Sequence, residues 1–315
     1  MLKLLSQRLA LGLVTLIVVS GLIFWATELL PGDLPTNILG QQATPEDVAA
    51  IRAELGLDRP VPQRYVAWVK DALKGDFGQS VVSKRPVMAV LGPRLWNTLF
   101  LVIYAAVVAV PFSILLGILA AVGRNGLYDK VVNIAALAAI SMPKFLIGFL
   151  LLLYLAVHFR WFPVITTFKP DQTLLQHLKD IFLPMATLVV VVAAHMIRMA
   201  RSALLAVMAS PYIEMAKFKG LSNWRIVTHH ALPNALAPIV RIVALNLGYL
   251  IAGAIVVEVV FTYNGFGRLM VDAVARHDVP VVQACGLVFA VVFIGLHLVA
   301  DLLCMLSDAS LRHGQ

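Results

Sequence analysis

The sequence is poor in charge, poor in cysteine and free of the short motifs that mark common catalytic sites. Only 13% of its 315 residues are charged, whereas soluble proteins average about 25%. With 60% hydrophobic residues, the chain has too little charge to cover a soluble globule. This shortage excludes an ordinary soluble domain and predicts an all-α membrane protein with several spans, because helices satisfy their own backbone groups in lipid.

The two cysteines of the chain, Cys285 and Cys304, lie in one apolar run. On a helix they would be roughly 28 Å apart. They therefore cannot form a disulfide with each other, and we interpret both as small apolar side chains that fill space.

No sequence motif supports an enzyme. Gly123-Arg124-Asn125-Gly126 lacks the spacing and the lysine of a phosphate-binding loop, so the chain is not expected to hydrolyse ATP. Zinc-peptidase and serine-nucleophile motifs are also absent. His229 and His230 are adjacent, so one helix face cannot present both to a metal. We predict a non-catalytic chain with no catalytic residue, no metal site and no cofactor of its own.

Six apolar runs are long enough, at about 20 residues, to cross a membrane as helices. They cover residues 9–30, 96–122, 131–157, 181–207, 236–262 and 284–306. Pro111 in the second run and Ser141-Met142-Pro143-Lys144 in the third predict interruptions. Backbone groups freed at that depth need protein partners or a water-lined cavity.

The net charge of +8 could suggest nucleic acid, but basic residues of membrane proteins collect in cytoplasmic loops. A cytoplasmic N-terminus places Arg124, Lys130 and the basic loop after the fourth run inside, and six spans return the C-terminus to the cytoplasm. We therefore predict a multi-pass protein of the bacterial cytoplasmic (inner) membrane, in contact with lipid and without a nucleic-acid partner.

Three parts of the chain follow from this topology. Residues 1–30 form the N-terminus and first span, residues 31–95 an extracytoplasmic loop, and residues 96–315 a core with a cytoplasmic loop at 210–235. In the outer loop, Thr44-Pro45-Glu46-Asp47 predicts a helix start and Gly56 its end. A second helix is predicted near Pro62. A small folded cap on the membrane is favoured over a separate ligand-binding domain.

Polar residues inside the apolar runs are candidates for a translocation pathway: Lys144, His195, Asn246 and Glu258. Lys144 lies near mid-span, where a lysine normally faces an aqueous path, although it could instead reach an interface. Interhelical hydrogen bonds would explain the other residues equally well.

His195 also belongs to a stripe of basic residues that includes Arg198 and Arg201, spaced by three. We interpret most of this stripe as anchoring at the membrane surface, with His195 as the member that faces the interior.

The segment between the fourth and fifth runs predicts a cytoplasmic helix-turn-helix. Ser210-Pro211 can start a helix that Gly220 ends. Ser222 can cap a second helix that runs to about His230 and is closed by Pro233.

The first of these helices carries a pattern suited to a partner protein. Glu214 and Lys217 lie about one turn apart, Ala216 is small enough for close approach, and Phe218 is apolar. Together they would form a compact knob for a groove on a partner. An amphipathic helix lying on anionic lipid is the alternative, but it does not explain the turn at Gly220.

The spacing Glu214-x-Ala216-x-x-x-Gly220, followed by Leu232-Pro233, resembles the EAA loop of ABC importer permeases. Nearly the whole chain is similar to the B-type subunit of the dipeptide/oligopeptide/nickel permease family. Further matching motifs are Leu30-Pro31-Gly32-Asp33, Ala53-Glu54-Leu55-Gly56-Leu57, Gly75-Asp76-Phe77-Gly78, Glu258-x-x-Phe261, Gly265-Phe266-Gly267-Arg268 and Asp278-Val279-Pro280-Val281-Val282-Gln283.

This resemblance implies a permease that forms half of a translocation pathway for peptides or similar small solutes. The implied partners are a second, C-type permease, two ATP-binding subunits that hold ATP and Mg²⁺, and an extracytoplasmic solute-binding protein. The implied ATPase-coupling residues are Glu214, Ala216, Lys217, Gly220, Leu221 and Ser222.

Two alternatives remain open. Within the family, the solute could be nickel or another chelated metal; if Lys144 lines the pathway, however, its charge favours a carboxylate-bearing peptide over a bare cation. Outside the family, the chain could be an ion-coupled carrier or a membrane scaffold without an ATPase partner.

Overall fold

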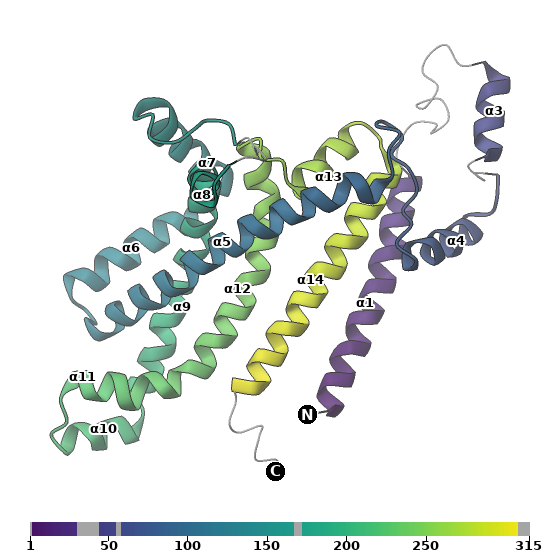
Figure 1. Ribbon diagram of the computed structural model, residues 1–315. Coiled ribbons are helices and arrows are strands. Elements are labelled where there is room, and N and C mark those ends of the chain that lie inside the picture. The colour runs from purple at the N-terminus through teal and green to yellow at the C-terminus, as the bar shows by residue number, and fades with distance from the viewer. Residues whose placement is uncertain (1, 30–43, 55–57, 167–171, 308–315) are drawn as a thin grey trace. The chain divides into compact units, whose positions relative to one another are not determined.

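The computed structural model describes residues 2–29, 44–54, 58–166 and 172–307. Within these ranges the chain is helical, apart from turns and one isolated antiparallel bridge between Gln79 and Pro86 (Figure 1). The expected helix end at Gly56, the motif at residues 30–33 and the C-terminus lie outside them.

The elements are α1 (Leu2–Glu28), α3 (Pro45–Glu54), α4 (Val61–Leu73), α5 (Val87–Val122), α6 (Leu127–Ser141), α7 (Lys144–Leu151), the π-helix η1 (Leu152–His158), α8 (Leu174–Asp180), α9 (Phe182–Met208), α10 (Pro211–Phe218), α11 (Asn223–Arg225), the π-helix η2 (Ile226–Ala231), α12 (Leu232–Val260), α13 (Phe266–Ala275) and α14 (Val279–Ser307).

The helices confirm the all-α membrane fold. Among the described residues, five helical segments are long and apolar enough to cross a membrane: two lie within α1 and α14, two coincide with α5 and α9, and one combines η2 and α12. A further pair, Leu127–Ser141 and Lys144–His158, bends by 107° and raises the number of spans to six if it crosses as one. The bend lies at Met142 and Pro143, as expected from the missing donor of proline.

The expected interruption at Pro111 is wrong, because α5 continues through it from Val87 to Val122. Membrane helices tolerate proline where neighbouring helices and hydroxyl side chains satisfy the freed backbone. Pro111 removes the helical donor to the Val107 carbonyl, four residues earlier, yet the helix continues past it. The proline is thus accommodated within a continuous span.

The chain divides into two compact units. The first contains residues 1–8, 98–264 and 295–315, and the second contains residues 9–97 and 265–294. In the first unit, α9 packs against α6, α7 and α12, and most of its length is buried (Figure 1). The C-terminal part of α5 approaches α9 closely at Gly117. A Cβ added to this glycine would lie only 2.8 Å from the Ile197 carbonyl oxygen, so a larger residue would not fit there.

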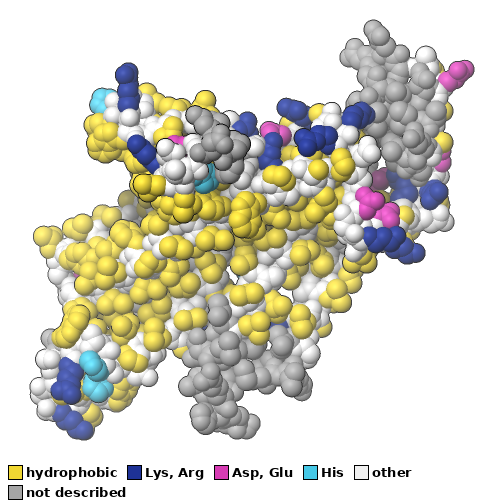
Figure 2. All heavy atoms as spheres, viewed as in Figure 1, with side chains coloured by type: hydrophobic (Ala, Val, Ile, Leu, Met, Phe, Trp, Pro, Cys, Tyr) yellow, Lys and Arg dark blue, Asp and Glu magenta, His cyan; other side chains and the backbone are white. Residues whose placement is uncertain are grey.

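The outer side chains of the first unit are apolar. Ile103 and Val107 on α5 and Ile134 on α6 are each more than half exposed in the isolated chain. Figure 2 shows that hydrophobic side chains cover much of the visible surface over α5 and α6. Apolar side chains in this position are expected to face lipid or another membrane subunit.

In the second unit, α4 packs on α1. Phe24 on α1 lies 5.5 Å from Tyr65 and 5.8 Å from Trp68 on α4, measured between ring centroids. Arg64 on α4 forms an ion pair with Glu28 on α1. These contacts make α4 a folded element held against α1.

A second anchor in this unit is the buried carboxylate of Asp278. It accepts hydrogen bonds from the Ser80 hydroxyl at 2.5 Å and from the backbone amides of Val81 and Val82 at 3.0 and 3.4 Å. The segment before α5 is thereby tied to the residue that precedes α14. Beside it, a core that includes Val87, Leu91, Phe266 and Cys285 is fully or almost fully buried.

We expect Asp278→Ala to loosen this segment, because a buried hydroxyl and two amides lose their acceptor at a cost of about 1–3 kcal/mol per unsatisfied group. The measurement is limited trypsin cleavage after Lys84, which should become several-fold faster. Asp272→Ala is the control, since Asp272 makes only a partly exposed ion pair with Arg268 at 3.7 Å. Equal cleavage of both variants would contradict the anchoring role.

Candidate functional site

The predicted helix-turn-helix is present at the end of α9. Ser210 precedes α10 with extended backbone, and Pro211 occupies its first turn. Proline is well placed there because its missing N–H would have no helical partner in any case. The predicted start of this helix is therefore confirmed.

A glycine turn ends α10. Gly220 has a φ of +75°, which side-chain-bearing residues rarely adopt. Its amide donates to the Lys217 carbonyl at 2.9 Å, and the Leu221 amide donates to the Ala216 carbonyl at 3.3 Å. This pair of bonds is the Schellman arrangement, which caps the last carbonyls of a helix. Gly220 thus fixes where α10 stops and how the chain turns back.

The two sides of α10 differ in what they contact. Ile213 and Ala216 are buried in a core cluster with Leu204 and Ile226 of the same chain, and Leu221 packs against that cluster. The expectation that Ala216 belongs to the exposed knob is not what the geometry shows, because its side chain faces the chain's own core. Its small size lets α10 approach that core.

The outer side of α10 and α11 is open in the described chain. Glu214 and Lys217 are exposed, Phe218 is 85% exposed and Trp224 is 72% exposed. We call these four residues the coupling surface. Figure 2 shows basic and histidine side chains gathered over α10, α11 and η2 at the edge of the apolar surface. Trp224 was not singled out from the sequence, although an exposed tryptophan in a polar loop is a recognisable interface signal.

The second helix does not stop at His230. α11 leads into the π-helix η2, which leads directly into α12, and Ile226–Val260 is continuous as a span. Pro233 lies in the first turn of α12 and does not close the segment. A π-turn just before a proline is consistent with the missing donor of Pro233, which disturbs the regular helical ladder.

A small polar cluster ties α10 to this continuous helix. Asn234 donates its side-chain amide to the His230 carbonyl at 2.8 Å and to the Tyr212 hydroxyl at 3.1 Å. The Tyr212 hydroxyl in turn donates to the His230 carbonyl at 3.4 Å. A displacement of α10 would therefore be transmitted to the start of α12.

Two of the candidate pathway residues reach the surface of the first unit. His195 is exposed on α9 and lines a groove of about 360 Å³ together with Arg198. Lys144 is partly exposed at the start of α7, and its amine lies 3.5 Å from where a Cβ on Gly253 of α12 would be.

The other two candidates are internal to the chain. Asn246 is buried and donates its side-chain amide to the Ile242 carbonyl at 2.8 Å. Glu258 is fully buried and accepts a hydrogen bond from the Thr98 hydroxyl. Burial first, and the Glu258 carboxylate second, raise the pKa of the nearby Tyr263 phenol, which therefore stays neutral. The Glu258–Thr98 hydrogen bond thus joins α12 to α5, whereas the Asn246 hydrogen bond lies within α12.

The basic residues on α9 do not all have the same kind of contact. Arg201 does not anchor at a surface as expected, because its guanidinium forms a bidentate ion pair with Asp129 at 2.6 and 2.7 Å. Asp129 is 3% exposed and also accepts from the Asn125 amide and the Asn133 side chain. Asp129 was missed in the sequence, where only its position at the start of an apolar run hinted at a partner.

No cluster of three His, Cys, Asp or Glu side chains suited to a metal ion occurs among the residues that the structure covers.

Comparison with known proteins gives matches along the whole chain. The family described as "Binding-protein-dependent transport system inner membrane component" matches residues 113–313, and its N-terminal counterpart matches residues 1–102. The chain is 40% identical to the glutathione transport system permease protein GsiC of Salmonella choleraesuis over 99% of its length and all of the relative's. It is 39% identical to GsiC of Escherichia coli K12 with the same coverage.

A solved structure of the MetNI methionine ABC transporter, in inward-facing conformations, has a similar fold. The TM-score is 0.55, and the match covers 70% of this chain and 97% of the solved one. At 17% sequence identity, this likeness concerns the fold alone.

Proposed function

We propose how this chain works from one premise: it belongs to the family of binding-protein-dependent transport system inner membrane components, and is the permease subunit of an ABC importer. We propose that it forms half of the pathway for a peptide-like solute such as glutathione, the solute in the names of its relatives. A second, C-type permease would supply the other half, and an external binding protein would deliver the solute.

The coupling surface is the observation that carries the mechanism. Its exposed residues stand on a helix whose other side is packed into the core, so a force applied there moves α9 and α12 rather than a loose loop. Two partner ATPase subunits would bind ATP and Mg²⁺, and this chain would contribute no catalytic residue. In this proposal Glu214, Lys217, Leu221 and Ser222 lie at or beside the docking surface, while Ala216 and Gly220 set its shape.

The proposed orientation follows from the same residues. The coupling surface must lie in the cytoplasm, where ATP is available, which places both chain ends inside and α4 outside. Lys217, Lys219 and Arg225 in this loop agree with the preference of basic residues for the cytoplasmic side.

The docking proposal predicts a large effect of Phe218→Asp. Burying a carboxylate in the partner's groove is unfavourable, and central aromatic residues often dominate interfaces, so we expect at least about a tenfold loss of ATPase subunits that copurify. The measurement is quantitative pull-down of the assembled complex from membranes. Leu127→Asp is the control, because Leu127 is 80% exposed in another loop proposed to be cytoplasmic. Unchanged copurification of Phe218→Asp would refute docking at this surface.

The solute class is tested by ATP-dependent uptake into vesicles that contain the complete importer and its binding protein. Labelled glutathione and ⁶³Ni²⁺ are the two probes. Uptake of glutathione supports the proposal, whereas uptake of nickel alone would replace it with the metal alternative.

A further inference from the structure

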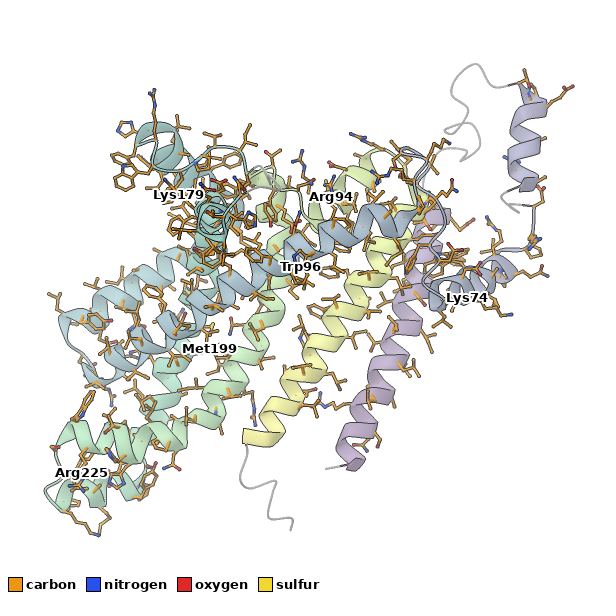
Figure 3. All side chains as sticks on the ribbon, in the orientation of Figure 1. Lys74, Arg94, Trp96, Lys179, Met199 and Arg225 are labelled. Carbon is orange, nitrogen blue, oxygen red and sulfur yellow. The ribbon has the colours of Figure 1, made fainter. Side chains whose placement is uncertain are left out.

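A groove on α9 contains polar and charged side chains near the middle of that helix. It is lined by Ile140 of α6, by His195, Arg198, Met199 and Ser202 of α9, and by Ile242 of α12, and has a volume of about 360 Å³. We call it the α9 groove. Met199, labelled in Figure 3, marks its position on that helix.

The positive charge in this groove is not neutralised by the described part of the chain. Arg201, one turn further along α9, is paired with Asp129 at 2.6 Å. Arg198 and His195 form no ion pair with an acidic side chain among the described residues, and none of the six lining residues is acidic. One arginine of the stripe therefore stabilises the fold, and the other is available for a ligand.

The position of Arg198 along α9 matters for its role, because an arginine without an ion-pair partner is unusual in the middle of an apolar helix. α9 has 27 residues, and His195 is at its midpoint. At 1.5 Å per residue the helix is about 40 Å long, so Arg198 lies only about 5 Å from the middle of α9, a helix long and apolar enough to cross a membrane. A charged side chain at that depth is unfavourable against lipid and normally faces a water-filled cavity or a partner charge.

Lys144 adds a second cationic side chain near α9. Its amine lies beside Gly253, and a Cβ there would also touch Leu188 of α9, at 3.3 Å. Leu188 precedes His195 by about two helical turns, so the two residues share one face of α9, roughly 10 Å apart along the axis. Lys144, His195 and Arg198 are thus arranged in sequence along one side of the first unit.

We propose that the α9 groove is a transient binding station for a carboxylate of the transported solute, with Lys144 as the preceding contact. This inference rests on the proposed import function and narrows the solute to one that carries a free carboxylate. A guanidinium can hold a carboxylate through two parallel hydrogen bonds. Several sites of moderate affinity in a row allow a charged solute to enter and also to leave, as passage through a transporter requires.

The test uses the purified complete importer, in which Cys285 and Cys304 are replaced by alanine and Ser202→Cys adds one thiol to the groove. Two methanethiosulfonate reagents, one with a sulfonate and one with a trimethylammonium group, are compared after normalisation to their rates with free mercaptoethanol. We expect the anionic reagent to be favoured, and Arg198→Gln to reduce that preference by roughly tenfold, because Arg198 lies about one turn from the thiol. Arg124→Gln removes an exposed charge elsewhere and should leave the preference unchanged.

Three results would overturn the proposal. The thiol could be unreactive, which would mean that the groove is covered by lipid or protein; the anionic reagent could show no preference; or Arg198→Gln could leave the preference intact. Each of these is independent of transport, so it can be found in an importer that takes up glutathione normally.

Uptake provides the second part of the test. With the same binding protein throughout, Arg198→Gln and Lys144→Met should each lower the maximal rate of glutathione uptake several-fold relative to Arg124→Gln. An equal rate in all variants would refute a role in passage. A wild-type importer that takes up no peptide would instead refute the proposed solute class, whatever the reagent preference.

Discussion

Replacing Gly220 by proline is expected to abolish transport while the chain still inserts into the membrane. Gly220 has a φ of +75°, whereas proline holds φ near −65°. Proline also removes the amide that donates to the Lys217 carbonyl. The turn after α10 would reverse its direction, and the coupling surface would no longer present Phe218 and Trp224 together.

A graded series at Gly220 separates backbone conformation from steric effects. A Cβ at this position would meet nothing within 4 Å, so only the backbone angle resists a side chain. Asparagine tolerates the left-handed region and should retain most activity. Alanine should lose about 1–2 kcal/mol of turn stability, and proline should be inactive.

The measurement is ATP-dependent uptake in reconstituted vesicles, together with ATPase activity and the amount of permease inserted. Transport should fall in the order asparagine, alanine, proline, at equal insertion. Normal uptake by Gly220→Pro would exclude this turn as the route by which ATP energy reaches the spans.

The second large effect concerns the ion pair between Arg201 and Asp129. Replacing Arg201 leaves the buried Asp129 carboxylate without its charged partner, and replacing Asp129 leaves the partly exposed Arg201 guanidinium unpaired. An unsatisfied buried polar group typically costs about 1–3 kcal/mol. We therefore expect Arg201→Gln and Asp129→Asn to lower both the yield of folded permease and its resistance to thermal aggregation in detergent.

Arg198→Gln is a matched control for this pair, because it removes an arginine one turn away on the same helix that has no ion pair in the described chain. It should remain near wild-type stability. The double variant Arg201→Gln with Asp129→Asn should recover part of the loss, since no uncompensated charge remains. If Arg198→Gln were as unstable as Arg201→Gln, general charge and not pairing would explain the effect.

The predicted and observed spans agree most closely where apolar length alone decides the structure. The fourth run, residues 181–207, differs from α9 by one residue at each end. The bend at Pro143 was also predictable, because proline lacks a donor wherever it occurs. Pro111 was not, because whether a proline breaks a helix depends on the groups around the freed backbone, and these come from the fold.

By itself the sequence determined the membrane class, the family and the helix-turn-helix around Gly220, since each depends on composition or on residues close together in the chain. Only the tertiary structure decided which side of each helix is buried, which is exposed and which charges are paired. It turned Ala216 inward while Phe218 and Trp224 remain exposed, paired Arg201 with Asp129, and left Arg198 in a groove. The physical reason is that burial and charge pairing depend on contacts between residues far apart in sequence, which local periodicity does not specify.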